Sequence, residues 1–165
     1  MGQVTNTTTN EGTISLGHTT TTVAIGSTGA GIKALDITAA TTTLGGTVKA
    51  TTITISSGAT LDAATNNITG TVANAGTLNL TTGVVSGAIT GAGVVNFADT
   101  QTTGAAITAT TINVDAGGAV TAGGAITGAV VVDSGTVLSM GDNAVTGAVA
   151  NAGTLNLTTG VVSGA

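Results

Sequence analysis

The chain lacks five residue types altogether: cysteine, proline, tryptophan, tyrosine and arginine. Phe97 is its only aromatic residue, Lys33 and Lys49 are its only lysines, and the formal net charge of the 165 residues is −5. Proteins that bind nucleic acids hold phosphates with basic patches and stack bases on aromatic rings. The sequence provides neither feature, and we therefore expect no nucleic-acid partner.

Long apolar runs are missing as well. A transmembrane helix needs about 18 or more consecutive apolar residues, and the sequence contains no such stretch, so we expect no transmembrane segment. The first residues, MGQVTNTTTNEG, have neither the basic start nor the apolar centre of a signal peptide. We therefore expect no signal peptide in this sequence, and export information was either removed or never part of it.

An internal repeat is the strongest positive feature. The segment 72–88, VANAGTLNLTTGVVSGA, returns without a change at 149–165. The match extends upstream without gaps, so that 54–88 corresponds to 131–165 in a 77-residue long repeat. Copies this similar are typical of repeated units that stack on one another, and they argue against a single globular core.

Short apolar-polar-apolar triplets mark the strands within the repeat, because alternation is the period of a strand with one buried face. Four triplets follow one another at a constant step of 17, beginning at Leu61, Leu78, Val95 and Ile112. We predict that these four side chains point into one core column. The next clear triplet begins at Leu138, a step of 26, which we interpret as a coil with an insertion or an extra short strand.

A second marker, Ile-Thr-Gly or Val-Thr-Gly, lies between the triplets at residues 68–70, 89–91, 126–128 and 145–147. It predicts at least one more strand per coil, and the glycines predict corners. Threonine, valine and glycine are weak helix formers, and no apolar stripe of helical period is present.

These patterns predict an all-β, repeat-built β-solenoid, a right-handed parallel β-helix with about 17–19 residues per coil. The alternative is an antiparallel β-sandwich, which has similar spacing between turns. We divide the chain into a Thr-rich segment 1–12, for which the sequence leaves order and disorder open, irregular β coils over 13–50, and the solenoid over 51–165.

Residues for catalysis and metal binding are scarce. His18 is the only histidine, and Glu11 and the six aspartates lack the aromatic and basic neighbours of a sugar-cleaving groove. Asp62, Asp133 and Asp142 are interpreted, like Asp115, as single acids at turns or on outward faces, where closing a turn is a commoner role than binding calcium. We therefore expect no enzyme activity, no catalytic residue, no cofactor and no metal site.

Asparagines and threonines have a structural interpretation. Asn79, Asn96 and Asn113 recur at the step of 17, which predicts a hydrogen-bonded ladder between coils. The Thr-x-Thr pattern of ice-binding solenoids does not recur at the coil period, and the threonines are interpreted as solvent-facing strand residues.

Two stretches, TLNLTTGVVSGAITGAGVVNF at 77–97 and TTINVDAGGAVTAGGAITGAVVVDSG at 110–135, resemble the passenger regions of bacterial autotransporters. The resemblance is greatest to rickettsial surface antigens of the outer-membrane A and B type. It covers residues 50–165 well and the first 50 loosely. The family pattern also has an export signal and a C-terminal translocator, and neither is found in this sequence.

The resemblance implies a rigid β-helical passenger segment outside the cell or on the outer bacterial surface. It would form a surface layer or act in adhesion, with a host-cell surface protein as partner. The alternative is a self-assembling extracellular fibre or viral tail-fibre subunit. Residues 161–165 carry no polar cap, and we expect copies of the chain to join through uncapped solenoid ends.

Overall fold

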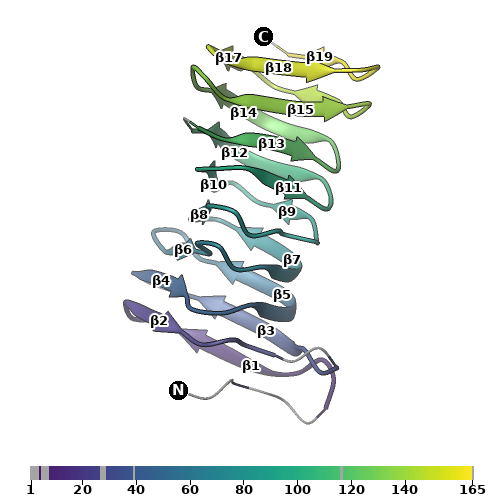
Figure 1. The fold of residues 1–165 in the computed structure, drawn as a ribbon. Coiled ribbons are helices and arrows are strands. Elements are labelled where there is room, and N and C mark those ends of the chain that lie inside the picture. Colours follow the sequence, from purple (N-terminus) through teal and green to yellow (C-terminus); the bar gives the residue numbers. More distant parts are fainter. Residues whose placement is uncertain (1–3, 5–7, 27–28, 39, 116, 165) are drawn as a thin grey trace.

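The chain winds into a rod of stacked turns, with its first and last coils at opposite ends (Figure 1). The structure is a computed structural model, and it describes residues 4, 8–26, 29–38, 40–115 and 117–164. Every regular element in these residues is a β-strand, and none of them belongs to a helix able to span a membrane. The strands are β1 (Glu11–Leu16), β2 (Thr20–Thr22), β3 (Ile32–Ile37), β4 (Thr41–Leu44), β5 (Val48–Ile55), β6 (Thr60–Asp62), β7 (Ile68–Asn74), β8 (Thr77–Leu80), β9 (Ile89–Thr90), β10 (Val94–Phe97), β11 (Gln101–Thr103), β12 (Ile107–Val114), β13 (Ala119–Ala122), β14 (Ile126–Val132), β15 (Val137–Gly141), β16 (Val145–Thr146), β17 (Val149–Asn151), β18 (Thr154–Leu157) and β19 (Val162–Ser163).

All described strand pairs are parallel, so the fold is a β-solenoid and the antiparallel sandwich is excluded. Each coil has three sides, which we number in chain order. Side 1 carries the inward column Ile14, Leu35, Ile53, Val72, Ile89, Ile107, Ile126, Val145 and Val162. Each step from one member of this column to the next is one turn of the solenoid. The chain therefore makes about eight turns.

Side 2 contains the core column expected from the triplets. Leu61, Leu78, Val95 and Ile112 pair in register and are fully buried. The column continues upward with Val130 and Val149. The prediction of one core column is thus confirmed.

The prediction of an insertion after Ile112 is wrong, because Leu138 lies on side 3 and not on side 2. Leu138 does not continue the side 2 column, since it pairs with Val120 and Leu155 in a separate sheet on side 3. The step of 26 from Ile112 to Leu138 is one full turn plus the passage to the next side, since Ile112 pairs with Val130 one turn later and Leu138 lies on the side that follows. An apolar-polar-apolar triplet has the same form on every side, because each side buries one face, and sequence spacing alone could not assign it to a side.

The two identical copies consequently occupy different sides. In the first copy Val72 lies on side 1 and Leu78 on side 2, whereas in the second copy Val149 lies on side 2 and Leu155 on side 3. The long repeat therefore advances the chain by four turns and one further side. The same sequence packs in both places because all three sides present the same alternation of inward apolar and outward small residues.

The N-terminal coils follow the same rules. β1 pairs with β3 and β3 with β5, residue against residue, and Val4 forms a parallel bridge with Ile25 on side 3. Within the Thr-rich segment 1–12, β1 begins at Glu11, and residues 1–3 and 5–7 lie outside the described residues.

Glycines form the corners after the Ile-Thr-Gly markers. Gly70, Gly91, Gly128 and Gly147 all have positive φ angles, between 129° and 143°, which residues with a Cβ rarely adopt. Each also lies against a backbone carbonyl of the coil below. The markers thus identify the points where the chain turns from one side to the next.

Candidate functional site

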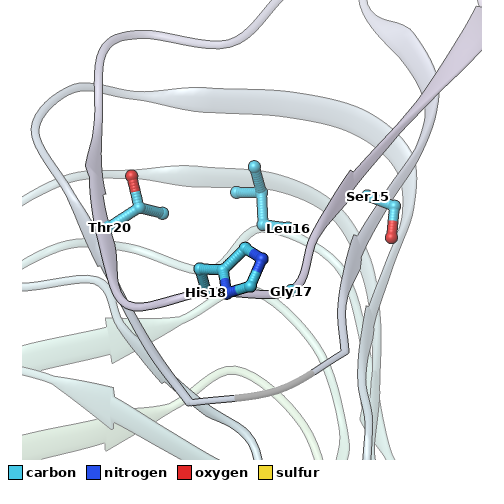
Figure 2. A pocket seen from close by; sticks show the side chains of 5 residues that line it. All are labelled: Ser15, Leu16, Gly17, His18 and Thr20. Atoms are coloured by element: carbon cyan, nitrogen blue, oxygen red, sulfur yellow. The ribbon is translucent and has the colours of Figure 1, made fainter.

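His18 lies in a shallow open pocket at the N-terminal end of the rod, together with Ser15, Leu16, Gly17 and Thr20 (Figure 2). The imidazole is exposed, and Figure 2 shows the Ser15 side chain well apart from it. No carboxylate lines this pocket among the described residues. The geometry contains no hydrogen-bonded nucleophile and base of the kind that acyl transfer requires.

Asp62 and Asp142 each accept a hydrogen bond with a structural role. The Asp62 carboxylate accepts a hydrogen bond from the Ala64 N–H at 3.0 Å, which closes a turn as expected. Asp142 accepts a hydrogen bond from the Thr159 hydroxyl at 2.7 Å and so links two coils. Over the described part of the chain, no three His, Cys, Asp or Glu side chains are grouped to hold a metal ion.

Asp115 and Asp133 are a pair of acids that the fold stacks. They directly follow the paired residues Val114 and Val132 on neighbouring coils. Burial, and then repulsion from Asp133, raise the pKa of Asp115 above its ordinary value. The pair is therefore a small electrostatic cost to the fold at neutral pH.

We expect the free energy of unfolding to fall as the pH rises from 3.8 through the raised pKa of Asp115. The folded state holds the proton more tightly than the unfolded state, so deprotonation favours unfolding. Asp115→Asn should remove this dependence and stabilise the fold at neutral pH, and Asp133→Asn should remove part of it. Thermal melts over a pH series measure the effect. The prediction would be wrong if, over this pH interval, the free energy of unfolding of the wild type rose relative to that of Asp115→Asn.

The asparagine ladder expected on side 2 is confirmed. The Asn96 side-chain NH₂ donates to the Asn79 side-chain oxygen at 2.8 Å, and Asn113 donates in turn to Asn96 at 2.7 Å. All three side chains are partly buried. The amides thus satisfy one another from coil to coil, which stabilises the stack.

Asn96→Ala should lower the free energy of unfolding by about 1–3 kcal/mol, because it leaves a donor and an acceptor unpaired on the two neighbouring coils. Asn156→Ala is the matched control, since Asn156 is the counterpart of Asn79 in the second copy and is exposed on the last coil. Urea denaturation of both variants gives the comparison. Equal losses would show that the ladder adds no stability.

Gln101 places a buried amide in the core of side 3. It is 3% exposed, and within the described structure its Nε2 has no hydrogen-bond partner. The next coils place Val120 and Leu138 at the same position. The Gln101 side chain is therefore a buried polar group within the side 3 column.

Gln101→Leu should raise the free energy of unfolding by about 1–3 kcal/mol, because it replaces an unpaired buried amide with an apolar side chain of similar size. Val120→Leu tests whether added bulk in this column stabilises by itself. Thermal melts of both variants decide the outcome. A destabilised Gln101→Leu would mean that the amide is satisfied within the core.

A hydroxyl column runs along the outside of side 1. Its members Thr108, Thr127, Thr146 and Ser163 are in register and exposed, and the hydroxyls of Thr146 and Ser163 are 3.4 Å apart. Sequence reasoning missed this column, although the Ile-Thr-Gly marker contains two of its threonines. The column is one residue wide, because alanine precedes each of its threonines by two positions.

The broader threonine ranks of an ice-binding surface do not form on this side. Thr52 and Thr54 make one Thr-x-Thr pair that faces outward on β5. The neighbouring coils place Asp36 and Ala73 opposite Thr54, so the pair is not repeated from coil to coil. This register is consistent with the interpretation of Thr52 and Thr54 as strand residues that face solvent. The same interpretation is wrong for Thr42, which is 0% exposed and pairs with Leu61 in the core column of side 2.

The last coil presents an apolar end face, defined here as Val149, Leu155, Leu157 and Val162. Leu157 and Val162 are 37% and 43% exposed. Comparison with known proteins finds no family model, no curated protein and no solved structure that matches the chain. The surfaces of the molecule itself are thus the basis for a functional proposal.

Proposed function

We propose that the chain is a non-enzymatic structural and interaction protein of the bacterial cell surface, a rigid β-helical passenger segment that acts in surface-layer formation or adhesion. The observation that carries the proposal is the unbroken side 1 column, which joins the coils in parallel register from β1 to β19. Stacked solenoids are quasi-one-dimensional and present extended surfaces to a partner.

The outer surface is consistent with this role. Outward strand positions carry mostly threonine, serine, asparagine and alanine, such as Thr102, Thr121, Ser139 and Asn156 on side 3. Short uncharged side chains give long, even flanks suited to lateral packing or to a broad contact. The resemblance to autotransporter passengers points in the same direction.

Antibodies against the chain should label intact cells of the bacterium that produces it, without permeabilisation. Fluorescent chain should also bind cultured host cells saturably and be displaced by an excess of unlabelled chain. Heat-unfolded chain is the control for nonspecific adsorption. Labelling that requires permeabilisation would overturn the surface location, and binding that does not saturate would leave layer formation as the role.

A second candidate is a self-assembling extracellular fibre or viral tail-fibre subunit. The specific observation in its favour is the apolar end face. Exposed strand edges without charge or proline pair readily with another chain.

A further inference from the structure

The duplicated sequence shows what a fully covered form of the apolar end face looks like. The segments 72–88 and 149–165 are identical, yet their burial differs. Leu80 and Val85 are each 1% exposed, whereas their counterparts Leu157 and Val162 are 37% and 43% exposed. The same side chains are thus buried in the middle of the rod and open at its end.

A parallel coil covers the first copy. Val72 pairs with Ile89 and Leu78 pairs with Val95, so the next turn adds β-strands in the same direction and places an apolar side chain over each column. The complement of the apolar end face is therefore a solenoid coil stacked in parallel. An adhesive patch of arbitrary shape would not reproduce these contacts.

The opposite end of the same molecule offers such a coil. An open pocket there is lined by Val4, Ile14, Leu16, Thr20, Thr22, Val23 and Ile25. Among the described strands, residues 13–16 of β1 pair only with β3, and β2 pairs only with β4, so no described strand covers their outer edge. Both ends of the rod thus expose strands on sides 1 and 2 together with an apolar interior.

We infer that the apolar end face of one copy stacks on the N-terminal coil of a second copy by parallel β-strand addition. Parallel pairing requires both chains to run in the same direction, so the C-terminal end meets an N-terminal end and never another C-terminal end. Such a contact is heterologous and does not close on itself, because the two surfaces lie at opposite ends of the rod (Figure 1). Its product is a filament with a direction. This inference rests on the second candidate function and adds the polarity of the joint and its surfaces.

Two variants block one end each. Val162→Lys places a charge in the apolar end face, and Leu16→Lys places one in the N-terminal pocket. Burying an unpaired lysine in the joint should weaken association by about a hundredfold or more. Val84→Lys is the matched control, because Val84 is a similarly exposed valine, 38% against 43%, on an inner coil. If Leu16→Lys loses the wild-type circular dichroism spectrum, Val4→Lys replaces it, since Val4 is 44% exposed and lines the same pocket.

Sedimentation velocity over a concentration series reads out the result. We expect wild type and Val84→Lys to form species that grow with concentration, and each end-blocked variant to remain monomeric. A mixture of the two blocked variants should form dimers and nothing larger, because one competent joint remains. Association of Leu16→Lys with itself would overturn the polarity while leaving a fibre. A monomeric wild type at every concentration would overturn both the inference and the fibre candidate.

Discussion

Leu78→Asp should abolish the cooperative unfolding transition of the central coils. We expect it to lower the free energy of unfolding by more than about 4–5 kcal/mol. Leu78 is 0% exposed and lies between Leu61 and Val95 in the side 2 column. A carboxylate there has no partner, and burying it costs far more than the leucine contacts that are lost. Urea denaturation followed by far-ultraviolet circular dichroism measures the loss.

Leu155→Asp is an unusually close control. Leu155 is the counterpart of Leu78 within the duplicated segment, but it is half-buried on the last coil. Because water reaches its side chain, we expect a loss several times smaller. Equal losses at the two positions would show that the column above Leu78 does not create its burial, and would contradict the stacking order.

Gly128→Ala should lower the free energy of unfolding by more than about 3 kcal/mol, which is the second largest effect expected in this chain. Gly128 has a φ of 143°, and an added Cβ would lie 2.1 Å from the Ala109 carbonyl oxygen. The substitution thus combines an unfavourable backbone angle with a steric clash against the coil below. Relief of either requires the two coils to separate at this corner.

Gly135→Ala separates the two causes. Gly135 also has a positive φ, 82°, but a Cβ there would meet no atom within 4 Å. Gly135→Ala should therefore lower the free energy of unfolding by only about 1–2 kcal/mol, the cost of the unfavourable backbone angle alone. Thermal melts of both variants give the comparison, and a Gly128→Ala protein as stable as Gly135→Ala would mean that the corner yields easily.

The sequence was sufficient for the fold class and for much of the register. Val95 and Ile112 could be placed in the Leu78 column because consecutive coils kept one length, so that spacing in sequence equalled spacing along the rod. The Asn79 ladder followed from the same constant step. In both cases a local pattern was enough, since stacking repeats it.

The side on which Leu138 lies could not be predicted in the same way. The triplet at Leu138 has the same form as the triplet at Leu61. The side on which it lies depends on the combined length of all the corners between the two triplets, and that length cannot be read from the triplets themselves. The Thr127 column was missed for a related reason, because its period is visible only after Ile-Thr pairs are assigned to side 1. Burial at Leu157 and Val162 depends on which coil lies above them, and that is a property of the stack.

The long repeat advances the chain by four turns and one further side, which is a third of a turn. It therefore acts as a screw operation, which combines a shift along the rod with a rotation about its axis. Each repeat unit carries its outward side chains along the rod and also around it, onto the neighbouring side. Three units in series would bring the pattern back to the side where it began. A solenoid lengthened in such units displays one sequence in every direction, so a ligand or antibody that recognises it finds a target from whichever flank it approaches.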